Sequence, residues 1–186
     1  MSWWDEWRER RRRRGIASGY VAVLFAEPAE PDVRWLMANG TGEDEDHARW
    51  ELRYARRALG LLTAQRDALD DRTASLVARE IASALARDPR VGPGKLRVAQ
   101  RQLNTRLTAY GDALAQRGGA GTGWHLGRAL LEFGGRRESV APELVAAAGD
   151  VLSRYIAECN AALRERFGTA ALPDDVAPSA LRAATR

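Results

Sequence analysis

The sequence predicts an all-α fold, an irregular antiparallel bundle of four main helices with shorter N-terminal and connecting helices. Apolar residues recur at alternating steps of three and four along several long stretches, which is the spacing of a buried helical face. Glycine and proline clusters and aspartate pairs separate these stretches, as expected of short connections between helices. The one strand-like stretch, residues 19–26, has no convincing partner strand elsewhere in the chain.

The composition is that of one globular domain with tails, or at most two small domains. The chain has 186 residues, of which 45% are hydrophobic and 29% are charged. Cys159 is the only cysteine, which excludes an intramolecular disulfide and a cysteine zinc site and fits a reducing compartment. No apolar run is as long as a membrane span, and the short run at residues 16–26 makes a poor secretory signal. We therefore expect a cytoplasmic protein.

Residues 1–40 are expected to pack on the bundle as a Trp/Arg-rich helix followed by an apolar segment. Ser2 suits the N-cap of the helix that carries the tryptophans and arginines. Gly15 and Gly19 punctuate the chain after this helix. Residues 19–26 have the composition of a strand, but an unpaired strand leaves its hydrogen bonds unmade, so we expect a buried helix there.

The stretch from Glu43 to Asp71 is expected to form the central helix of a bundle core that spans residues 41–168. A short helix capped by Asp32 precedes it, and Thr41 begins it. Two adjoining apolar stripes run along this stretch, the first of them broken only by Arg66. The stripes consist of Ala48, Leu52, Ala55, Leu59, Leu62 and Leu69, and of Trp50, Tyr54, Ala58 and Leu61. A helix that is apolar over two stripes needs more than one neighbour.

Three further long helices and one short helix complete the expected bundle. Apolar stripes at helical spacing predict long helices over residues 72–87, 96–114 and 142–167, and a short helix over residues 124–133. Gly168 suits the C-cap of the last helix. The polar, proline-containing residues 169–186 are expected to form a flexible tail.

The N-terminal helix carries the candidate binding residues. Residues 1–14 hold six arginines against three acidic residues, so they carry +3 of the chain's net charge of +4. Three tryptophans share one helical face beside this charge, and tryptophans are costly to leave exposed. They therefore either dock on the bundle or bind a partner. The candidate partner-binding residues are Trp3, Trp4, Trp7, Arg10, Arg11, Arg12, Arg13 and Arg14.

From these residues we expect a non-catalytic interaction or regulatory module that binds a protein partner, or itself, through the N-terminal helix. The alternative is a nucleic-acid or anionic-membrane binder that uses the arginine run. Arginines bind phosphates, and tryptophans can stack on bases or lie in a membrane interface. A second alternative is an enzyme or cofactor carrier with a cavity inside the bundle.

The histidines and the acidic clusters favour structural roles over metal binding. Glu43 and His47 would share one side of a helix as a possible metal pair, but no second pair completes a site in the bundle. Asp67 and Asp71 could both reach a divalent cation, yet a helix end followed by a helix cap explains them more simply. His125 stands alone in a glycine-rich connection. We expect no metal site and no cofactor.

Two glycine-rich turns and the cysteine give no catalytic site either. Residues 118–123 could cradle an anion at a helix start, but they lack the strand–turn–helix setting of a dinucleotide site. Residues 92–95 fail the phosphate-loop pattern because Leu96 replaces the required hydroxyl residue. Cys159 lies on an apolar helical stripe, where an inert thiol is the rule. We expect no catalytic residue among these groups.

Overall fold

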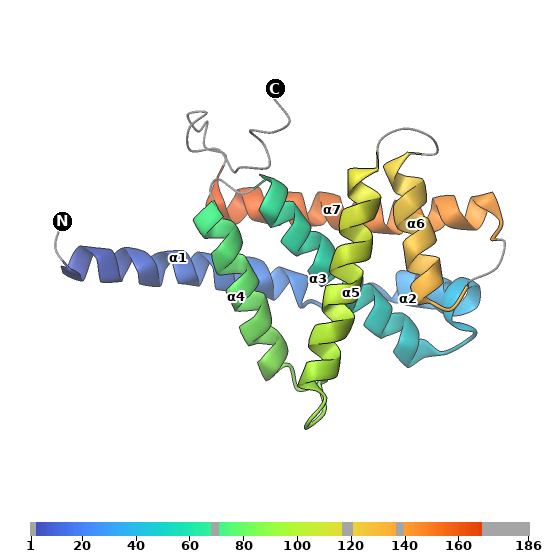
Figure 1. Cartoon of the computed structure of the whole chain (residues 1–186), viewed down its shortest axis with the longest axis horizontal. Coiled ribbons are helices and arrows are strands. Elements are labelled where there is room, and N and C mark those ends of the chain that lie inside the picture. Colours follow the sequence, from blue (N-terminus) through green and yellow to red (C-terminus); the bar gives the residue numbers. More distant parts are fainter. Residues whose placement is uncertain (1–2, 68–70, 117–120, 137–139, 169–186) are drawn as a thin grey trace.

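The computed structural model describes residues 3–67, 71–116, 121–136 and 140–168, and the regular structure within them is entirely helical. The all-α prediction is confirmed. The elements are α1 (Trp3–Leu24), α2 (Glu30–Leu36), a π-helical segment η1 (Met37–Thr41), α3 (Glu45–Asp67), α4 (Asp71–Arg87), α5 (Leu96–Ala115), α6 (Thr122–Phe133) and α7 (Pro142–Phe167) (Figure 1). The expected tail at residues 169–186 lies outside the described part of the chain.

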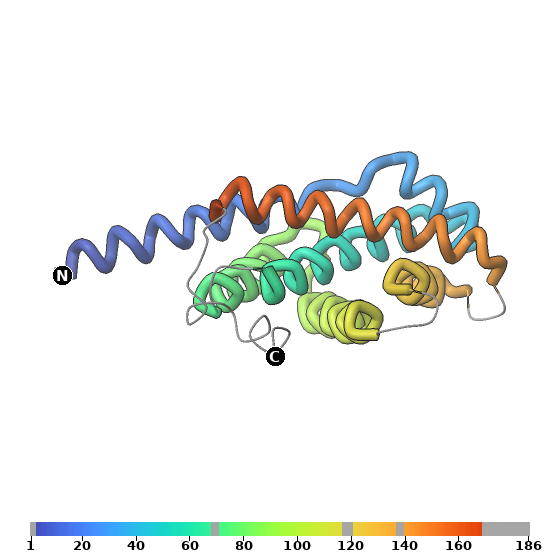
Figure 2. The backbone as a smooth tube through the Cα atoms, turned by 90° about the horizontal axis from the view of Figure 1, so that it is seen from above, coloured from blue at the N-terminus to red at the C-terminus, as the bar shows by residue number. Residues whose placement is uncertain are grey.

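The central position belongs to α3, as its two apolar stripes indicate. It contacts every other helix of the described chain. Figure 2 shows it between α1 and α7 on one side and α5 and α6 on the other. The most extensive helix pair is α6 with α7, which closes one end of the bundle. The other end is formed where α1 crosses α4 and α7.

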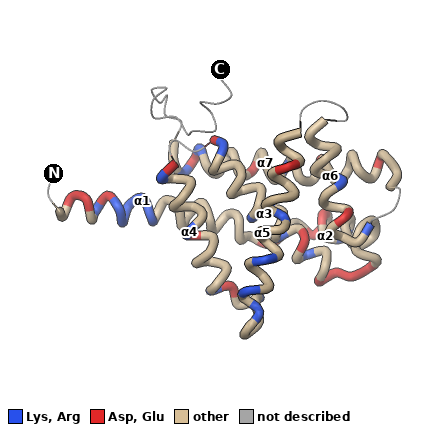
Figure 3. The backbone as a smooth tube through the Cα atoms, in the orientation of Figure 1, with Lys and Arg blue, Asp and Glu red and all other residues tan. Residues whose placement is uncertain are grey.

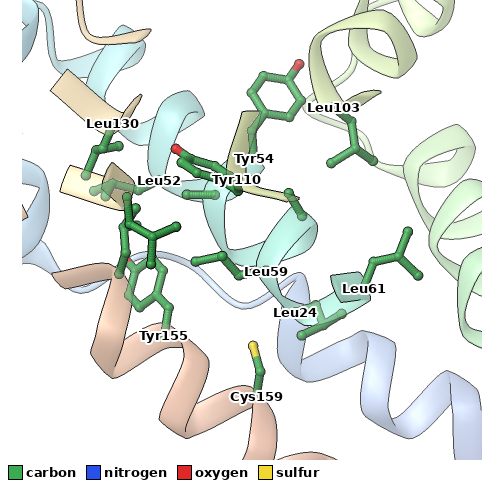
Figure 4. Packing of buried hydrophobic residues seen from close by; sticks show 14 of the residues in the cluster. Leu24, Leu52, Tyr54, Leu59, Leu61, Leu103, Tyr110, Leu130, Tyr155 and Cys159 are labelled. Atoms are coloured by element: carbon green, nitrogen blue, oxygen red, sulfur yellow. The ribbon is translucent and has the colours of Figure 1, made fainter. Parts of the chain in front are cut away.

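Both predicted stripes of α3 contribute to one continuous core. Leu52 and Leu59 from the first stripe and Tyr54 and Leu61 from the second are buried, while Trp50 is half-buried. Figure 4 shows how leucines and tyrosines from α1, α5, α6 and α7 converge on this helix. A helix buried on nearly all sides must pair with several neighbours, which is why α3 organises the bundle.

The N-terminal helix is longer than expected. Gly15 and Gly19 do not interrupt it, and α1 runs without a break from the tryptophans to Leu24. A glycine within a helix costs only about 1 kcal/mol relative to alanine. Burial of Tyr20 and Leu24 against the bundle outweighs that cost. The expectation of a buried helix at residues 19–26 holds as far as Leu24, and the chain turns after it.

Three helix starts differ from the expected positions. α2 begins two residues before Asp32, with a proline in its first turn, and α6 begins at Thr122 rather than at Trp124. Thr41 does not begin the central helix, because it ends η1. The start of α3 is capped by Asp44, whose carboxylate accepts the His47 backbone N–H at 2.9 Å. This cap satisfies an N–H that has no partner within the helix.

Three charged residues of α3, Glu51, Arg53 and Arg57, are buried, which the stripes did not predict. Arg57 is fully buried, lies 4.0 Å above the Phe25 ring centre and donates to the Asp88 carboxylate at 2.8 Å. Glu51 accepts from Arg106 of α5 at 2.5 and 3.0 Å. The first pair ties the end of α4 to α3, and the second ties α5 to α3. Arg53 pairs with Glu27 at 2.8 Å. Each buried charge of α3 thus has an opposite charge in contact, as burial requires.

Alkaline pH is expected to destabilise the folded protein. Burial raises the pKa of the Cys159 thiol to about 12 and raises the pKa of the Tyr20, Tyr110 and Tyr155 hydroxyls. These groups ionise in the unfolded chain at a lower pH than in the folded protein. Their contribution to the unfolding free energy is therefore complete below about pH 9.0 and declines as the pH rises towards 12.

Urea denaturation at a series of pH values, followed together with tyrosinate absorbance, measures this effect. Tyrosinate should form in step with unfolding. Tyrosines that ionise at their ordinary pKa in a protein that stays folded would contradict the prediction.

Candidate interaction surface

The candidate surface lies on the first half of α1, residues 3–14, which we call the Trp–Arg arm. In Figure 1 the arm extends beyond the other helices, and Figure 3 shows acidic residues at its start followed by a run of basic residues. The second half of the same helix packs on the bundle through Ala17, Tyr20, Val21 and Leu24. The arm is therefore a rigid extension of a helix that is anchored in the core.

The three tryptophans of the arm are exposed to solvent. Their exposed fractions are 61% for Trp3, 58% for Trp4 and 41% for Trp7. They pack on one another edge to face, with ring centres 4.7 Å apart between Trp3 and Trp4 and 6.2 Å apart between Trp4 and Trp7. The Arg11 guanidinium lies 5.3 Å from the Trp7 ring centre. The tryptophans therefore do not dock on the bundle, which was one of the two expectations from the sequence.

A groove of about 1210 Å³ runs between the arm and α4. The residues of the arm that line it are Asp5, Glu6, Glu9, Arg10, Arg12, Arg13 and Arg14, which we call the groove face. None of the tryptophans lines the described groove, and neither does Arg8 or Arg11. We call these five residues, Trp3, Trp4, Trp7, Arg8 and Arg11, the Trp face.

Ion pairs neutralise much of the charge on the groove face. Glu9 accepts from Arg13 at 2.8 Å and lies 3.9 Å from Arg12, and the Arg13 hydrogen bond holds the pKa of the Glu9 carboxyl below its usual value. Arg14 pairs with Glu80 of α4 at 2.8 Å. The Trp face carries no acidic residue. The two faces therefore differ in chemistry: one holds paired charges, the other tryptophans beside positive charge.

The sequence pattern indicates the arm but not this division. Arg10 to Arg14 form one continuous run in the sequence, and Arg8 stands outside that run. Arg8 is four residues after Trp4, so helical periodicity alone could have placed it on the Trp face. No local sequence pattern could predict the ion pair between Glu80 and Arg14, because the two residues are 66 positions apart along the chain.

The possible metal pair of Glu43 and His47 is not formed. Glu43 precedes α3 and has a left-handed backbone with a φ of 68°, so it does not share a helical face with His47. The His47 Nε2 atom lies 3.0 Å from the Phe133 carbonyl oxygen and 3.5 Å from the Glu51 carboxylate. No group of three or more metal-ligand side chains occurs within the described residues.

The aspartate pair, the glycine-rich turn before α6 and the cysteine, where they are described, take part in helix ends or in the core. Asp67 accepts from the neighbouring Arg66 at 2.8 and 2.9 Å, and Asp71 begins α4. Gly121 precedes α6 with a φ of 83°, while residues 117–120 lie outside the description. Cys159 is buried in the core.

His125 lies in the first turn of α6, where its backbone N–H donates to the Gly121 carbonyl oxygen. Lys95 precedes α5, and the preceding Gly94 has a φ of 74°. None of the described helices has an apolar stretch long enough to cross a bilayer. The chain matches no family model, no curated protein and no solved structure.

Proposed function

We propose that this chain is a non-catalytic interaction module whose binding element is the Trp–Arg arm. The observation that carries the proposal is the exposure of Trp3, Trp4 and Trp7 together on a projecting helix. Folded proteins rarely expose a contiguous aromatic cluster, and tryptophan and arginine are the residue types that dominate binding energy at interfaces. The cluster is preformed, so little side-chain entropy is lost when a partner covers it.

A protein partner, or a second copy of the chain, is the first candidate. Trp4 and Trp7 follow the i, i+3 spacing, and Trp3 and Trp7 the i, i+4 spacing, of the apolar anchors of a helix that binds in an apolar groove. A second candidate is an anionic surface. The observation that favours it is the Trp face itself, on which positive charge stands beside the tryptophans without an acidic residue.

Replacing all three tryptophans by alanine is expected to abolish partner binding and leave the bundle folded. The side chains are exposed, so the circular dichroism spectrum should not change and Tm should shift by no more than about 2 °C. Affinity purification from native extract, compared by quantitative mass spectrometry between the variant and the unmodified chain, measures the loss. Val98→Ala is the matched control, because Val98 is an exposed hydrophobic residue of α5, 45% accessible, outside the arm.

Unchanged capture of every protein by the triple variant would reject a protein partner for the arm. Loss of the helical spectrum would show that the tryptophans stabilise the bundle instead.

A further inference from the structure

We propose that the Trp face of the arm binds the surface of an anionic lipid bilayer, with α1 lying along the interface. This inference rests on the proposed function and names the partner of the same site. It makes the chain a peripheral membrane binder, and it assigns different roles to the two faces of one helix.

The tryptophans are the first argument. Indole rings combine a large apolar surface with one N–H donor, and they concentrate at the level of lipid headgroups. Trp3, Trp4 and Trp7 lie at the end of α1 that extends beyond the other helices, so a flat surface can approach them without meeting the bundle (Figure 1).

The distribution of charge is the second argument. Arg8 and Arg11 lie on the Trp face, and within the described part of the chain neither of them forms an ion pair. Arg12 and Arg13 stand on the groove face and share Glu9. An anionic surface that meets the Trp face therefore meets positive charge that the protein has not neutralised.

The rest of α1 is compatible with a helix that lies flat. The Trp face continues along the helix through Gly15, Ser18 and Ala22, which are all exposed and all small. No acidic side chain interrupts this line, and none of the three residues would hold the helix away from the headgroups. An interfacial helix needs this combination of aromatic residues, arginines and an unobstructed face.

Nucleic acid fits the same face less well. Proteins that bind single strands place aromatic rings so that successive bases stack on them. Here the rings of Trp3, Trp4 and Trp7 already pack on one another edge to face, and a base would have to separate them. Bilayer insertion needs no such separation, because the cluster can enter the interface as a unit.

The test uses the full chain and vesicles in a sedimentation assay. Vesicles of phosphatidylcholine with about one-third phosphatidylserine should bind the chain, and vesicles of phosphatidylcholine alone should bind it at least tenfold more weakly. Raising the salt concentration should weaken the binding, since the charges involved are exposed. The double variant Trp4→Ala/Trp7→Ala should reduce vesicle binding strongly at low and at high salt concentration.

Two arginine pairs provide a matched comparison. Arg8→Gln/Arg11→Gln removes two charges from the Trp face and is expected to weaken vesicle binding roughly thirtyfold. Arg12→Gln/Arg13→Gln removes the same charge from the groove face and should weaken it only a few-fold. All four side chains are exposed, so both variants should keep the circular dichroism spectrum of the unmodified chain.

Each outcome decides one question. Equal losses in the two arginine variants would overturn an oriented Trp face and leave only non-specific attraction. If the chain does not bind vesicles but the triple tryptophan variant still loses a partner from extract, the lipid proposal is wrong and the proposed function stands. If the chain binds duplex or single-stranded DNA but not vesicles, the lipid proposal is also wrong. If neither vesicles nor partners depend on the tryptophans, both proposals fail.

Discussion

Replacing Asp88 by asparagine is expected to lower the unfolding free energy by about 3–5 kcal/mol, because it leaves Arg57 charged and buried without a counter-charge. Arg57 has no exposed surface, and Asp88 is the acceptor of its Nη2 hydrogen bond at 2.8 Å. Burial already lowers the pKa of Arg57, and the Asp88 carboxylate opposes that shift. Asp88 also accepts from the backbone and side chain of Arg90, so the turn after α4 loses support as well.

The control for Asp88 is Glu132→Gln, which breaks a solvent-exposed pair between Glu132 and Arg128. That change should cost no more than about 1 kcal/mol. Chemical denaturation of both variants gives the comparison. A second variant, Asp88→Asn/Arg57→Met, removes both charges and should recover part of the lost stability. Equal stability of the Asp88 and Glu132 variants would contradict the role assigned to this ion pair.

Replacing Gly127 by alanine is expected to destabilise the contact between α6 and α7 by about 3 kcal/mol, since overpacking a close contact forces the backbone to move. A Cβ atom at Gly127 would lie 2.1 Å from the Val145 carbonyl oxygen and 2.8 Å from the Gly149 backbone nitrogen. Neither atom belongs to a flexible side chain, so the two helices would have to separate.

Gly123→Ala is the matched control on the same helix. A Cβ atom at Gly123 would meet nothing within 4 Å, and alanine favours the helix by up to about 1 kcal/mol over glycine. Thermal unfolding should therefore show a lower Tm for the Gly127 variant and an unchanged or higher Tm for the Gly123 variant. The reverse order would mean that α6 and α7 do not pack as closely as described.

Much of the fold could be predicted from the sequence because hydrophobic periodicity is local information. The stripes of α3 followed from it, and Pro142 and the C-cap residue Gly168 marked the two ends of α7. Periodicity could not reveal that Arg57 is buried, because its partner Asp88 is 31 residues away and a charged residue is expected to face solvent. Gly15 and Gly19 predict breaks only while the burial of Tyr20 and Leu24 against the bundle is unknown, and that burial stabilises the continuous helix.

The candidate surface was predictable in composition but not in arrangement. Three tryptophans beside an arginine run are visible in the sequence, but their exposure depends on where the bundle ends. The pairing of Arg14 with Glu80 depends on how α4 crosses α1, which no local pattern specifies.

The unbroken course of α1 through Gly15 and Gly19 determines how binding would be transmitted. No linker separates the tryptophans from Tyr20 and Leu24, so the arm acts as a stiff lever of about 18 Å. A partner held at its tip would fix both the distance and the tilt of the whole bundle. A force on the arm would act on the contacts of α1 with α3, α4 and α7. The stability of these contacts would therefore determine how firmly a bound partner holds the bundle in one orientation.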